Sequence, residues 1–353
     1  MTLHLEEKQQ YDRHIILDEI GLSGQEKLKQ ARVLVIGAGG LGCPILQYLT
    51  ASGVGTIGII DNDVVSQSNL QRQVLYTHND IGKSKAQTAA YRLSGLNPFV
   101  NFVVYNERLS TENAIHLFNL YDIIVDGSDN FATRYLVNDA AVLNNKPVVF
   151  GSIFKFEGQV SVYNFKNGPT YRCLYPTPPE ANTVPNCSEI GVLGVLPGII
   201  GSFQANEVIK IICGIGTVLT KKLLTFNTLT MQQVVLNYKK DRSITIDALQ
   251  ENYDLNCALT RQAISEITMK ELKSSQEEYT LLDVRTLLER EYFNIGGLHI
   301  PLQELDSSFD EINTDKQIIV YCKAGMRSEM AIHILKEKGL KNNLINLKGG
   351  LFY

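Results

Sequence analysis

The sequence predicts two successive α/β domains, of which the first is the larger. Short β-rich runs alternate with helical segments, a pattern typical of a largely parallel sheet covered on both faces. A length of 353 residues exceeds that of one ordinary small domain. After Asn237 the chain becomes polar and irregular before a second group of strands and helices begins. We therefore expect domains at residues 1–240 and 263–353, joined by a linker at 241–262.

The elements of the first domain follow from hydrophobic periodicity and from glycine breaks. Residues 7–30 are expected to be helical, with a break marked by Gly21 and Gly24. Residues 32–61 predict a strand, a helix and a second strand. The other expected elements are strands at 101–105, 122–126 and 146–153, a helix at 131–144, an antiparallel strand at 156–164, a loop at 176–191 and an apolar helix at 193–213.

The second domain is expected to repeat the α/β pattern on a smaller scale. Its strands are predicted at 278–284, 317–321 and 343–347. A helix is predicted at 327–339, ending at Gly339. The chain shows no internal repeat and no low-complexity tract, so each domain is expected to fold around its own core.

Composition and charge exclude several classes of protein. A net charge of −4 without a basic run gives no reason to expect nucleic-acid binding. No apolar run is expected to span a bilayer, and the N-terminus lacks the apolar core of a signal peptide, so we expect a cytoplasmic protein. The six cysteines are widely spread, which favours free, catalytic or metal-binding thiols over a disulfide framework.

A glycine-rich turn follows the first predicted strand. Its glycines are Gly37, Gly39, Gly40 and Gly42. Such a turn lets the backbone approach a phosphate, and the helix that follows offers unpaired N–H groups. Asp61 closes the next strand, where an acidic side chain meets a ribose hydroxyl. The motif predicts a nucleotide site, and by itself it fits a dinucleotide dehydrogenase equally well.

Polar and charged residues beyond this strand favour ATP. Arg72 and Lys85 supply cations that a dehydrogenase does not need beside its pyrophosphate, and Asn69 and Gln73 lie in the same segment. A site that attacks the α-phosphate of ATP needs such cations, because charge develops on the transferring group and on the leaving pyrophosphate. Asp129 follows another predicted strand, at the sheet edge where ligands bind, and its carboxylate can hold Mg²⁺.

The first two thirds of the chain resemble the ThiF/MoeB/HesA family of ubiquitin-activating-like adenylyltransferases, which have a Rossmann-like fold. The motifs that carry the resemblance are YDRHIIL, VLVIGAGGLG, IDNDVVSQSNLQRQ, GKSKA, DGSDNFATRY, FEGQVSVYN and VLGVLPGIIGSFQANEVIK. The resemblance implies that ATP adenylylates the C-terminal Gly-Gly carboxylate of a ubiquitin-like partner. It implies that Asp61 holds the ribose and that Arg72 and Lys85 hold the phosphates. It also implies that Asn69 orients the triphosphate and that Asp129 binds Mg²⁺.

Three further expectations come from the same resemblance. Arg13 matches an arginine that is contributed across a homodimer interface, so a homodimer is implied. Cys187 matches the position where some members form a thioester or acyl-persulfide, while others only adenylylate. The family's two Cys-x-x-Cys zinc pairs keep only Cys173 and Cys257 here. Two thiolates bind zinc far less well than four, so zinc is not expected.

The end of the chain, residues 263–353, resembles a rhodanese domain. The matching segments are LLDVR, GGLHIP, CKAGMR and NLKGG. The resemblance implies that Cys322 carries sulfur as a persulfide, stabilised by loop N–H groups. Gly325 allows the loop to turn, and Arg327 adds positive charge or anchors the loop. The Cys-x₄-Arg loop is the sulfur-sized form, one residue shorter than in related phosphatases, and Asp283 and Arg285 match supporting positions.

Together the two resemblances imply a fused adenylyltransferase and sulfurtransferase, as in molybdopterin-synthase adenylyltransferases with a sulfurtransferase domain. The first domain would activate a ubiquitin-like sulfur carrier, and Cys322 would convert its carboxylate into a thiocarboxylate. The sulfur would come from a cysteine desulfurase or from thiosulfate, and the carrier would serve molybdopterin, thiamine or tRNA thiolation. Two alternatives stay open: a rhodanese domain that only recruits partners, and an NAD-dependent oxidoreductase.

Overall fold

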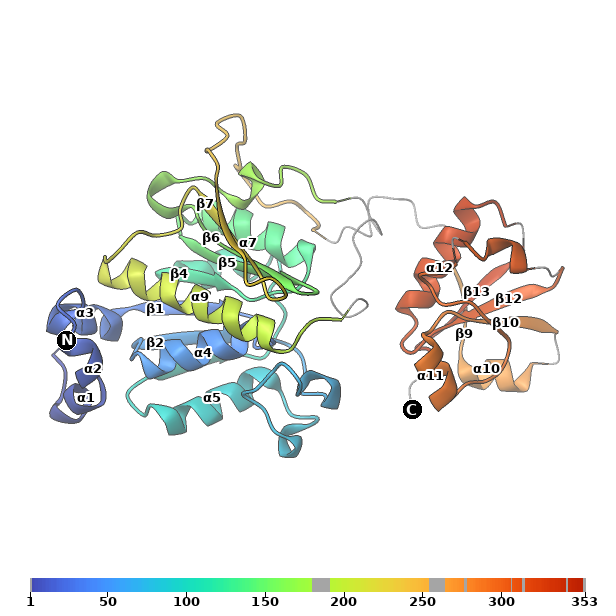
Figure 1. The fold of residues 1–353 in the computed structure, drawn as a ribbon, viewed down its shortest axis with the longest axis horizontal. Helices are drawn as coiled ribbons and strands as arrows, with labels where there is room; N and C mark the ends of the chain where they lie inside the picture. The colour runs from blue at the N-terminus through green and yellow to red at the C-terminus, as the bar shows by residue number, and fades with distance from the viewer. Residues whose placement is uncertain are drawn as a thin grey trace. The chain divides into compact units, whose positions relative to one another are not determined.

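The computed structural model describes residues 2–179, 191–253, 264–275, 278–305, 307–312, 315–340 and 342–351. The chain divides into two compact units, Met1–Asn256 and Cys257–Tyr353 (Figure 1). Each unit contains a sheet with helices packed on it, so the predicted α/β class is confirmed for both. The ends of the linker remain a prediction, because residues 254–263 lie outside the described part of the chain.

The first unit is built on an eight-stranded sheet with the order β3-β2-β1-β4-β5-β6-β7-β8 (Figure 1). Strands β1 to β5 are parallel, and β6 to β8 continue the sheet antiparallel. The chain moves outward from β1 to β3 and then returns to β4 on the other side of β1. In open α/β sheets such a switch point opens a crevice at the carboxyl ends of the strands. The strands are β1 Arg32–Ile36, β2 Thr56–Ile60, β3 Asn101–Tyr105, β4 Ile123–Asp126, β5 Val148–Phe154, β6 Glu157–Tyr163, β7 Lys222–Asn227 and β8 Gln233–Asn237.

Helices cover both faces of this sheet. Val33 and Val35 of β1 point to the face covered by α4, α5 and α9, whereas Leu34 and Ile36 point to the face covered by α6 and α7. Because both faces of β1 are buried, its sequence is a continuous apolar run. Figure 1 shows α4 beside α9, with α5 next to α4. The helices are α1 Leu5–Gln10, α2 Asp12–Ile15, α3 Gly21–Gln30, α4 Gly42–Ala51, α5 Lys85–Leu96, α6 Ala114–Asn119, α7 Phe131–Leu143 and α9 Val195–Cys213, and the short 3-10 turns are η1 Gln67–Asn69, η2 His78–Asp80, η3 Phe165–Asn167 and η4 Tyr171–Cys173.

Helix α9 corrects one expectation from the sequence. By length and composition alone this helix could cross a membrane, whereas the sequence analysis expected no run long enough. In the structure α9 packs against α4, β5 and β6. Its polar residues Gln204 and Glu207 are buried and bonded: Gln204 Nε2 donates to the Asp126 carbonyl at 2.8 Å, and Glu207 Oε2 accepts from the Leu219 N–H at 2.8 Å. In this unit 44% of its apolar stretch is buried, as expected for a helix packed on a sheet rather than one placed in a membrane.

Two other details of the first unit differ from prediction. Gly24 does not break the helix: it lies inside α3, where a side chain would stand 2.9 Å from Ile20 and 3.5 Å from Cys213. The break falls before Gly21 instead. The sequence analysis also missed α5, α6, β7 and β8. Strand β8 is exposed along its whole length, although its sequence QVVLN contains three successive apolar residues.

A buried polar network holds part of the predicted linker on the first unit. Tyr253, expected within the linker, is 7% exposed. Its hydroxyl donates to Asp139 Oδ2 at 2.8 Å. Both oxygens of Asp139 also accept from the Arg172 guanidinium at 2.7 Å, and this ion pair raises the pKa of Arg172. The network fixes η4 and the segment ending at Tyr253 to α7.

The second unit has a five-stranded parallel sheet with the order β11-β10-β12-β13-β9 (Figure 1). Strand β12 is central, flanked by β10 and β13, and its residues 318–321 are fully buried. The loop after β12 therefore starts from a rigid support. The elements are β9 Ser265–Ile267, α10 Met269–Ser274, β10 Tyr279–Asp283, α11 Leu287–Tyr292, β11 Leu298–His299, η6 Phe309–Glu311, β12 Gln317–Tyr321, α12 Met326–Glu337 and β13 Leu344–Leu347.

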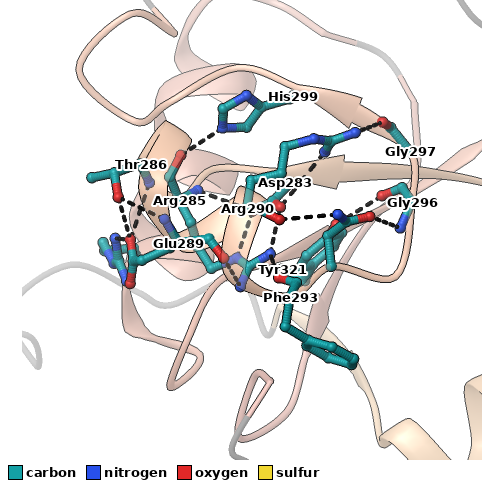
Figure 2. Close-up of polar contacts among 12 residues, drawn as sticks. Asp283, Arg285, Thr286, Glu289, Arg290, Phe293, Gly296, Gly297, His299 and Tyr321 are labelled. Atoms are coloured by element: carbon teal, nitrogen blue, oxygen red, sulfur yellow. Dashed lines mark hydrogen bonds and ion pairs between the residues drawn. The ribbon is translucent and has the colours of Figure 1, made fainter.

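An ion pair inside the second unit ties the end of β10 to α11. Asp283 and Arg285 are fully buried, and Arg285 donates to both oxygens of the Asp283 carboxylate at 2.8 and 2.7 Å. Arg285 also donates to the carbonyl groups of Glu289 and Phe293. Figure 2 shows the two side chains facing each other, with His299 bonded to the Arg285 carbonyl. The pair organises the segment that leads into α11.

The Asp139 network makes the first testable prediction. The substitution Asp139→Asn removes the charge that compensates buried Arg172, so the free energy of unfolding should fall by roughly 3 kcal/mol. Tyr253→Phe removes one hydrogen bond and should cost about 1 kcal/mol. Urea denaturation followed by circular dichroism measures both values. The control Asp12→Asn changes an exposed pair that is 4.0 Å apart, and it should have almost no effect. Equal values for Asp139→Asn and Asp12→Asn would contradict a structural role for the network.

Candidate functional site

A cavity of about 260 Å³ lies at the carboxyl ends of β1, β2 and β4 in the first unit. This is the switch point of the sheet, where the topology predicts a ligand crevice. Eight residues that the sequence analysis singled out line the cavity. They are Gly37, Gly39, Gly40, Asp61, Arg72, Gln73, Lys85 and Asp129.

The glycine turn is shaped by close backbone contacts. Gly37 has a φ of +88°, which side-chain-bearing residues rarely adopt. A Cβ on Gly42 would lie 2.0 Å from the Gly37 carbonyl oxygen, so only glycine fits where α4 begins. Gly42 does not line the cavity itself; it allows α4 to start directly behind the turn. The turn therefore brings backbone N–H groups and a helix N-terminus to the cavity, as phosphate binding requires.

Asp61 is held in place by the backbone around it. Its Oδ2 accepts from the Ala38 N–H at 2.7 Å and its Oδ1 from the Asp63 N–H at 2.8 Å. Burial raises the pKa of this carboxyl, and the two N–H donors oppose that shift. The carboxylate thus links the end of β2 to the glycine turn after β1. It lies where the sequence predicts the ribose contact, and that role remains a prediction.

The predicted cations reach the cavity from two segments. Arg72 Nη1 donates to the Ser68 carbonyl at 3.1 Å, and its side chain passes beside Gly40. Lys85 begins α5, is nearly buried, and pairs with Asp63 at 2.9 Å. An anionic ligand in the cavity would therefore contact two cations, Arg72 and Lys85. Because Lys85 is already shielded from water, its attraction for an anion is stronger than that of a solvated cation.

Gln73 and Asn69 differ in what they offer a ligand. Gln73 is 4% exposed, and its Oε1 has no hydrogen-bond partner among the described residues. A buried acceptor without a partner at the edge of a cavity suits a ligand that donates a hydrogen bond. Asn69 does not line the cavity: its Oδ1 accepts from the Ser66 N–H at 3.2 Å and caps η1. Its predicted contact with a triphosphate is not seen in this geometry and remains a prediction.

Residues 127–130, directly after β4, complete the cavity, and Asp126 at the end of β4 holds Ser128 in place. Asp126 is 1% exposed, and its Oδ1 accepts from the Ser128 N–H and hydroxyl, at 2.9 and 2.6 Å. Burial raises the pKa of Asp126. Asp129 is exposed at the cavity rim, where its carboxylate faces solvent.

Asp129 fits a magnesium ion that is shared with phosphates. Mg²⁺ usually takes one or two carboxylates, keeps several waters and takes further oxygens from substrate phosphates. Within the described ranges no group of three or more His, Cys, Asp or Glu side chains could hold a metal alone. The donor set therefore fits an ion that arrives with a nucleotide. The metal itself remains a prediction.

Several polar residues that line the cavity were not selected by sequence reasoning, among them Asp63, Asn130 and Arg134. Arg134 donates to the Ser128 carbonyl at 3.4 Å, and its guanidinium stacks over the rings of Phe131 and Phe150. Its Nε is buried and has no partner among the described residues. The sequence did contain a signal for Arg134, because this arginine ends the DGSDNFATR motif and lies in the first turn of α7.

Besides Gly42 and Asn69, four residues predicted for adenylylation or for a zinc site lie away from this cavity or outside the described chain. Arg13 is on α2 with 88% of its side chain exposed, and it forms a loose pair with exposed Asp12 at 4.0 Å. Cys187 and Cys257 lie outside the described residues. Cys173 Sγ accepts from the N–H groups of Thr170 and Asp241 at 3.3 and 3.4 Å. The expectations of a dimer arginine, of a covalent cysteine and of no zinc therefore stay untested.

The second unit holds Cys322 directly after β12. The cysteine is 1% exposed, and its Sγ accepts from the Gly325 N–H at 3.1 Å. Gly325 has a φ of +93° and precedes α12, so the loop turns back over the sulfur and presents a helix N-terminus to it. A helix N-terminus and an N–H donor both stabilise a thiolate. This arrangement matches the predicted sulfur-binding loop.

Arg327 anchors the loop. Its two terminal nitrogens donate to the two carboxylate oxygens of Glu289, at 2.7 and 2.6 Å. The guanidinium holds the pKa of Glu289 down at about 2. Glu289 also accepts from the N–H and hydroxyl of Thr286 at the start of α11 (Figure 2). Of the two roles that the sequence left open, the geometry supports anchoring, because Glu289 neutralises the charge of Arg327.

The Glu289 pair predicts a specific acid sensitivity. The folded-state pKa of about 2 lies below the ordinary value of 4.5. A depressed carboxyl pKa adds stability that is present above pH 4.5 and is lost as the pH falls towards 2. The second unit of the Glu289→Gln variant should therefore be less stable than that of the wild type at pH 6. Its free energy of unfolding should also fall less than the wild-type value as the pH is lowered. Urea denaturation at pH 6 and pH 3 measures this difference. Glu291→Gln, on the exposed side of α11, should keep the wild-type pH dependence, and identical profiles for both variants would refute the assignment.

Comparison with known proteins identifies both units. Residues 11–244 match the model of the ThiF family, and residues 268–352 match that of the rhodanese-like domain. The chain is 42% identical to the probable adenylyltransferase/sulfurtransferase MoeZ of Mycobacterium tuberculosis, over 99% of this chain and 93% of that protein. It is 39% identical to the adenylyltransferase and sulfurtransferase MOCS3 of Xenopus laevis, over 97% and 84% of the two chains.

Two further relatives match the first unit. The sulfur carrier protein adenylyltransferase of Thermus thermophilus is 52% identical over 64% of this chain and 84% of that protein. The structure of E. coli MccB with ATP superposes with a TM-score of 0.57 at 23% identity, covering 63% of this chain and 68% of that one, which shows a shared fold. The chain therefore belongs to the ThiF family and carries a C-terminal rhodanese-like domain.

Proposed function

We propose that this protein adenylylates the C-terminal Gly-Gly carboxylate of a ubiquitin-like sulfur carrier with ATP and then converts it into a thiocarboxylate. One observation carries the proposal: a glycine turn and two cations share a cavity at the switch point, on a chain that also buries a cysteine in a sulfur-sized loop. The names of the relatives, which pair adenylyltransferase with sulfurtransferase and mention a sulfur carrier protein, support this substrate.

The first unit would perform the adenylylation. A carboxylate oxygen of the carrier attacks the α-phosphorus of ATP, and the bond to pyrophosphate breaks, with the electron pair leaving on pyrophosphate. The glycine turn would hold the phosphates, and Asp61 would hold the ribose. Arg72 and Lys85 would neutralise charge on the transferring and leaving groups, which is the main way that proteins accelerate this reaction. Lys85 and Asp63 form an ion pair at the cavity wall. When ATP binds, the Lys85 ammonium would leave Asp63 and contact the phosphates.

Magnesium would complete this site. Asp129 would hold the ion at the rim of the cavity, together with phosphate oxygens and water. The ion would supply positive charge to the triphosphate when it is bound. Arg134, which stacks on two rings beside the cavity, would add a fixed cation near the incoming carboxylate.

The second unit would supply sulfur. The Cys322 thiolate takes a sulfane sulfur from thiosulfate or from a cysteine desulfurase, which gives a persulfide. The outer sulfur then attacks the acyl carbon of the adenylate, and AMP leaves with the electron pair of the broken C–O bond. Reduction of the remaining S–S bond by a thiol releases the thiocarboxylate. Carrying both sites on one chain raises the effective concentration of the sulfur donor.

We also propose the finer features that the resemblance implies. The protein would be a cytoplasmic homodimer in which Arg13 completes the partner's nucleotide site. Cys187 would hold the carrier covalently during the reaction. The first domain would end near residue 240, and the second would begin near residue 263. The carrier would belong to molybdopterin synthesis, thiamine synthesis or tRNA thiolation.

A docking role for the rhodanese domain is the second candidate. A rhodanese-like domain that only recruits partners would not need a sulfur loop, yet Cys322 is buried with an N–H donor on its sulfur. An NAD-dependent oxidoreductase is a weaker candidate, because it gives Arg72 and Lys85 no role in the cavity.

Intact mass spectrometry of a Gly-Gly carrier tests the proposal. With ATP, Mg²⁺, thiosulfate and a thiol, the wild-type protein should replace one carrier oxygen by sulfur. Lys85→Ala should slow the reaction by roughly 100-fold, because it removes a cation that the transition state needs. Cys322→Ala should stop at the adenylate.

A matched control is available two residues away. Lys83 is exposed and does not line the cavity, so Lys83→Ala should react like the wild-type protein. If Cys322→Ala still produced thiocarboxylate at the wild-type rate, the domain would be a docking module. If Lys85→Ala and Lys83→Ala reacted alike, the nucleotide site would be misplaced.

A further inference from the structure

Ala38, in the middle of the glycine turn, is held by side chains on both sides of its backbone. It is completely buried between Gly37 and Gly39. Its N–H donates to Asp61 Oδ2 at 2.7 Å, and its carbonyl oxygen accepts from the Tyr76 hydroxyl at 2.7 Å. Glycine adopts either sign of φ, so a peptide unit that ends in glycine can turn over at little conformational cost. The Tyr76 bond therefore fixes a peptide unit, Ala38–Gly39, that its own residues leave adjustable.

Tyr76 supplies this bond from the protein interior. The residue is 5% exposed and does not line the nucleotide cavity. Burial raises the pKa of Tyr76, so its hydroxyl keeps its proton and stays a donor. The Lys85 carbonyl oxygen lies 3.2 Å from this hydroxyl, farther than that of Ala38, which is therefore the main acceptor. The buried Cys43 thiol is a second donor to Ala38, at 3.7 Å, and burial raises the pKa of Cys43 to about 12.

The inward carbonyl of Ala38 decides where the next N–H points. The Ala38–Gly39 bond is trans, and in a trans peptide the C=O and N–H bonds lie in one plane and point in opposite directions. The Gly39 N–H therefore points away from Tyr76. Gly39 lines the cavity, and among the described residues its N–H has no hydrogen-bond partner. A donor of this kind suits a phosphate oxygen, because backbone N–H groups at such turns form anion sites.

We infer that Tyr76 is a positioning residue for ATP, whose hydroxyl holds the Ala38 carbonyl in the interior and so presents the Gly39 N–H to a phosphate. The inference rests on the proposed adenylylation. It adds a residue that lies behind the cavity wall and acts through the backbone. The Asp61 carboxylate binds the N–H on the other side of Ala38, so the ribose contact should not depend on Tyr76.

Without the hydroxyl, the peptide unit would lose the group that holds it. Tyr76→Phe keeps the buried ring and removes one donor, and a buried carbonyl that loses its donor is destabilised. The Cys43 thiol, at 3.7 Å, is a weak donor and does not replace the hydroxyl. If the peptide turns over, the Ala38 carbonyl oxygen faces the cavity in place of the Gly39 N–H. A carbonyl oxygen repels phosphate oxygens, whereas an N–H attracts them, so ATP binding weakens.

Two measurements on the full-length Tyr76→Phe protein test the inference. Isothermal titration calorimetry with ATP and Mg²⁺ should show a Kd raised by roughly 10-fold or more, as expected for loss of one hydrogen bond to a charged group. Adenosine, which has no phosphate, is measured by its competition with ATP and should bind as tightly as it binds the wild-type protein. A crystal structure of the ligand-free variant should show the Ala38–Gly39 peptide turned over or in both orientations.

Tyr91→Phe is the matched control. Tyr91 is 81% exposed on α5, so loss of its hydroxyl should change neither measurement. The double variant Tyr76→Phe/Lys85→Ala separates two routes, because the Tyr76 hydroxyl also lies near the Lys85 carbonyl. If Tyr76 acts through the Gly39 N–H, the two substitutions should weaken ATP binding additively. A double variant that binds ATP like Lys85→Ala alone would show that Tyr76 acts through Lys85 and overturn the inference.

The remaining outcomes separate the inference from the proposed function. A Tyr76→Phe protein that binds ATP like the wild type, or that keeps the wild-type peptide orientation, would overturn the inference. Equal losses of affinity for ATP and adenosine would show general damage to the site and overturn it as well. A wild-type protein that binds neither ligand would overturn the proposed nucleotide site. The peptide orientation in crystals of Tyr76→Phe would still decide the role of the hydroxyl in that case, because it needs no nucleotide.

Discussion

The close approach of the backbone at the glycine turn is the constraint on which the first site depends. With a Cβ on Gly42 only 2.0 Å from the Gly37 carbonyl oxygen, α4 could not begin where it does. A Cβ placed on Gly37 would lie 3.0 Å from the carbonyl oxygen of Gly127, in the turn after β4. The turns after β1 and β4 are therefore in contact. That contact places the α4 N-terminus, Asp61 and Asp129 around one cavity at the switch point of the sheet.

The second unit uses the same local device for another chemistry. In both units a buried parallel strand ends in a loop with a positive-φ glycine, and a helix begins behind it. The first loop opens into a cavity lined with cations, which suits a triphosphate. The second encloses a single sulfur, and Glu289 neutralises its arginine. The difference in chemistry thus comes from the side chains around the loop and from its size, while the backbone arrangement is shared.

Much of both sites could be predicted from sequence, because the residues lie in short motifs at strand ends. Gly37, Gly39, Gly40, Asp61, Arg72, Lys85 and Asp129 line the cavity, whereas Gly42 and Asn69 do not. What could not be predicted depends on contacts between distant segments. Glu289 is 38 residues from its partner Arg327, and Tyr76 is equally far from Ala38, whose carbonyl it binds. No local pattern reveals such pairs.

The same reason explains the features of the fold that periodicity did not show. Helix α9 is long and apolar enough to span a membrane by composition alone, but in the structure it packs against α4, β5 and β6, which periodicity cannot show. Tyr253 lies in the segment predicted as a linker, and nothing in the sequence indicated that its hydroxyl donates to Asp139, 114 residues away. Gly24 was taken for a helix break, but a close contact with Ile20 explains the glycine.

The most direct test of the account is which nucleotide the first site binds. Isothermal titration calorimetry of the full-length protein with ATP and Mg²⁺, and separately with NAD⁺ and NADH, measures this without turnover. The account predicts binding of ATP that Lys85→Ala weakens and Lys83→Ala does not, with no binding of either dinucleotide. Tight binding of NAD⁺ or NADH without binding of ATP would contradict it, because the cations of the cavity would then have been assigned to the wrong ligand.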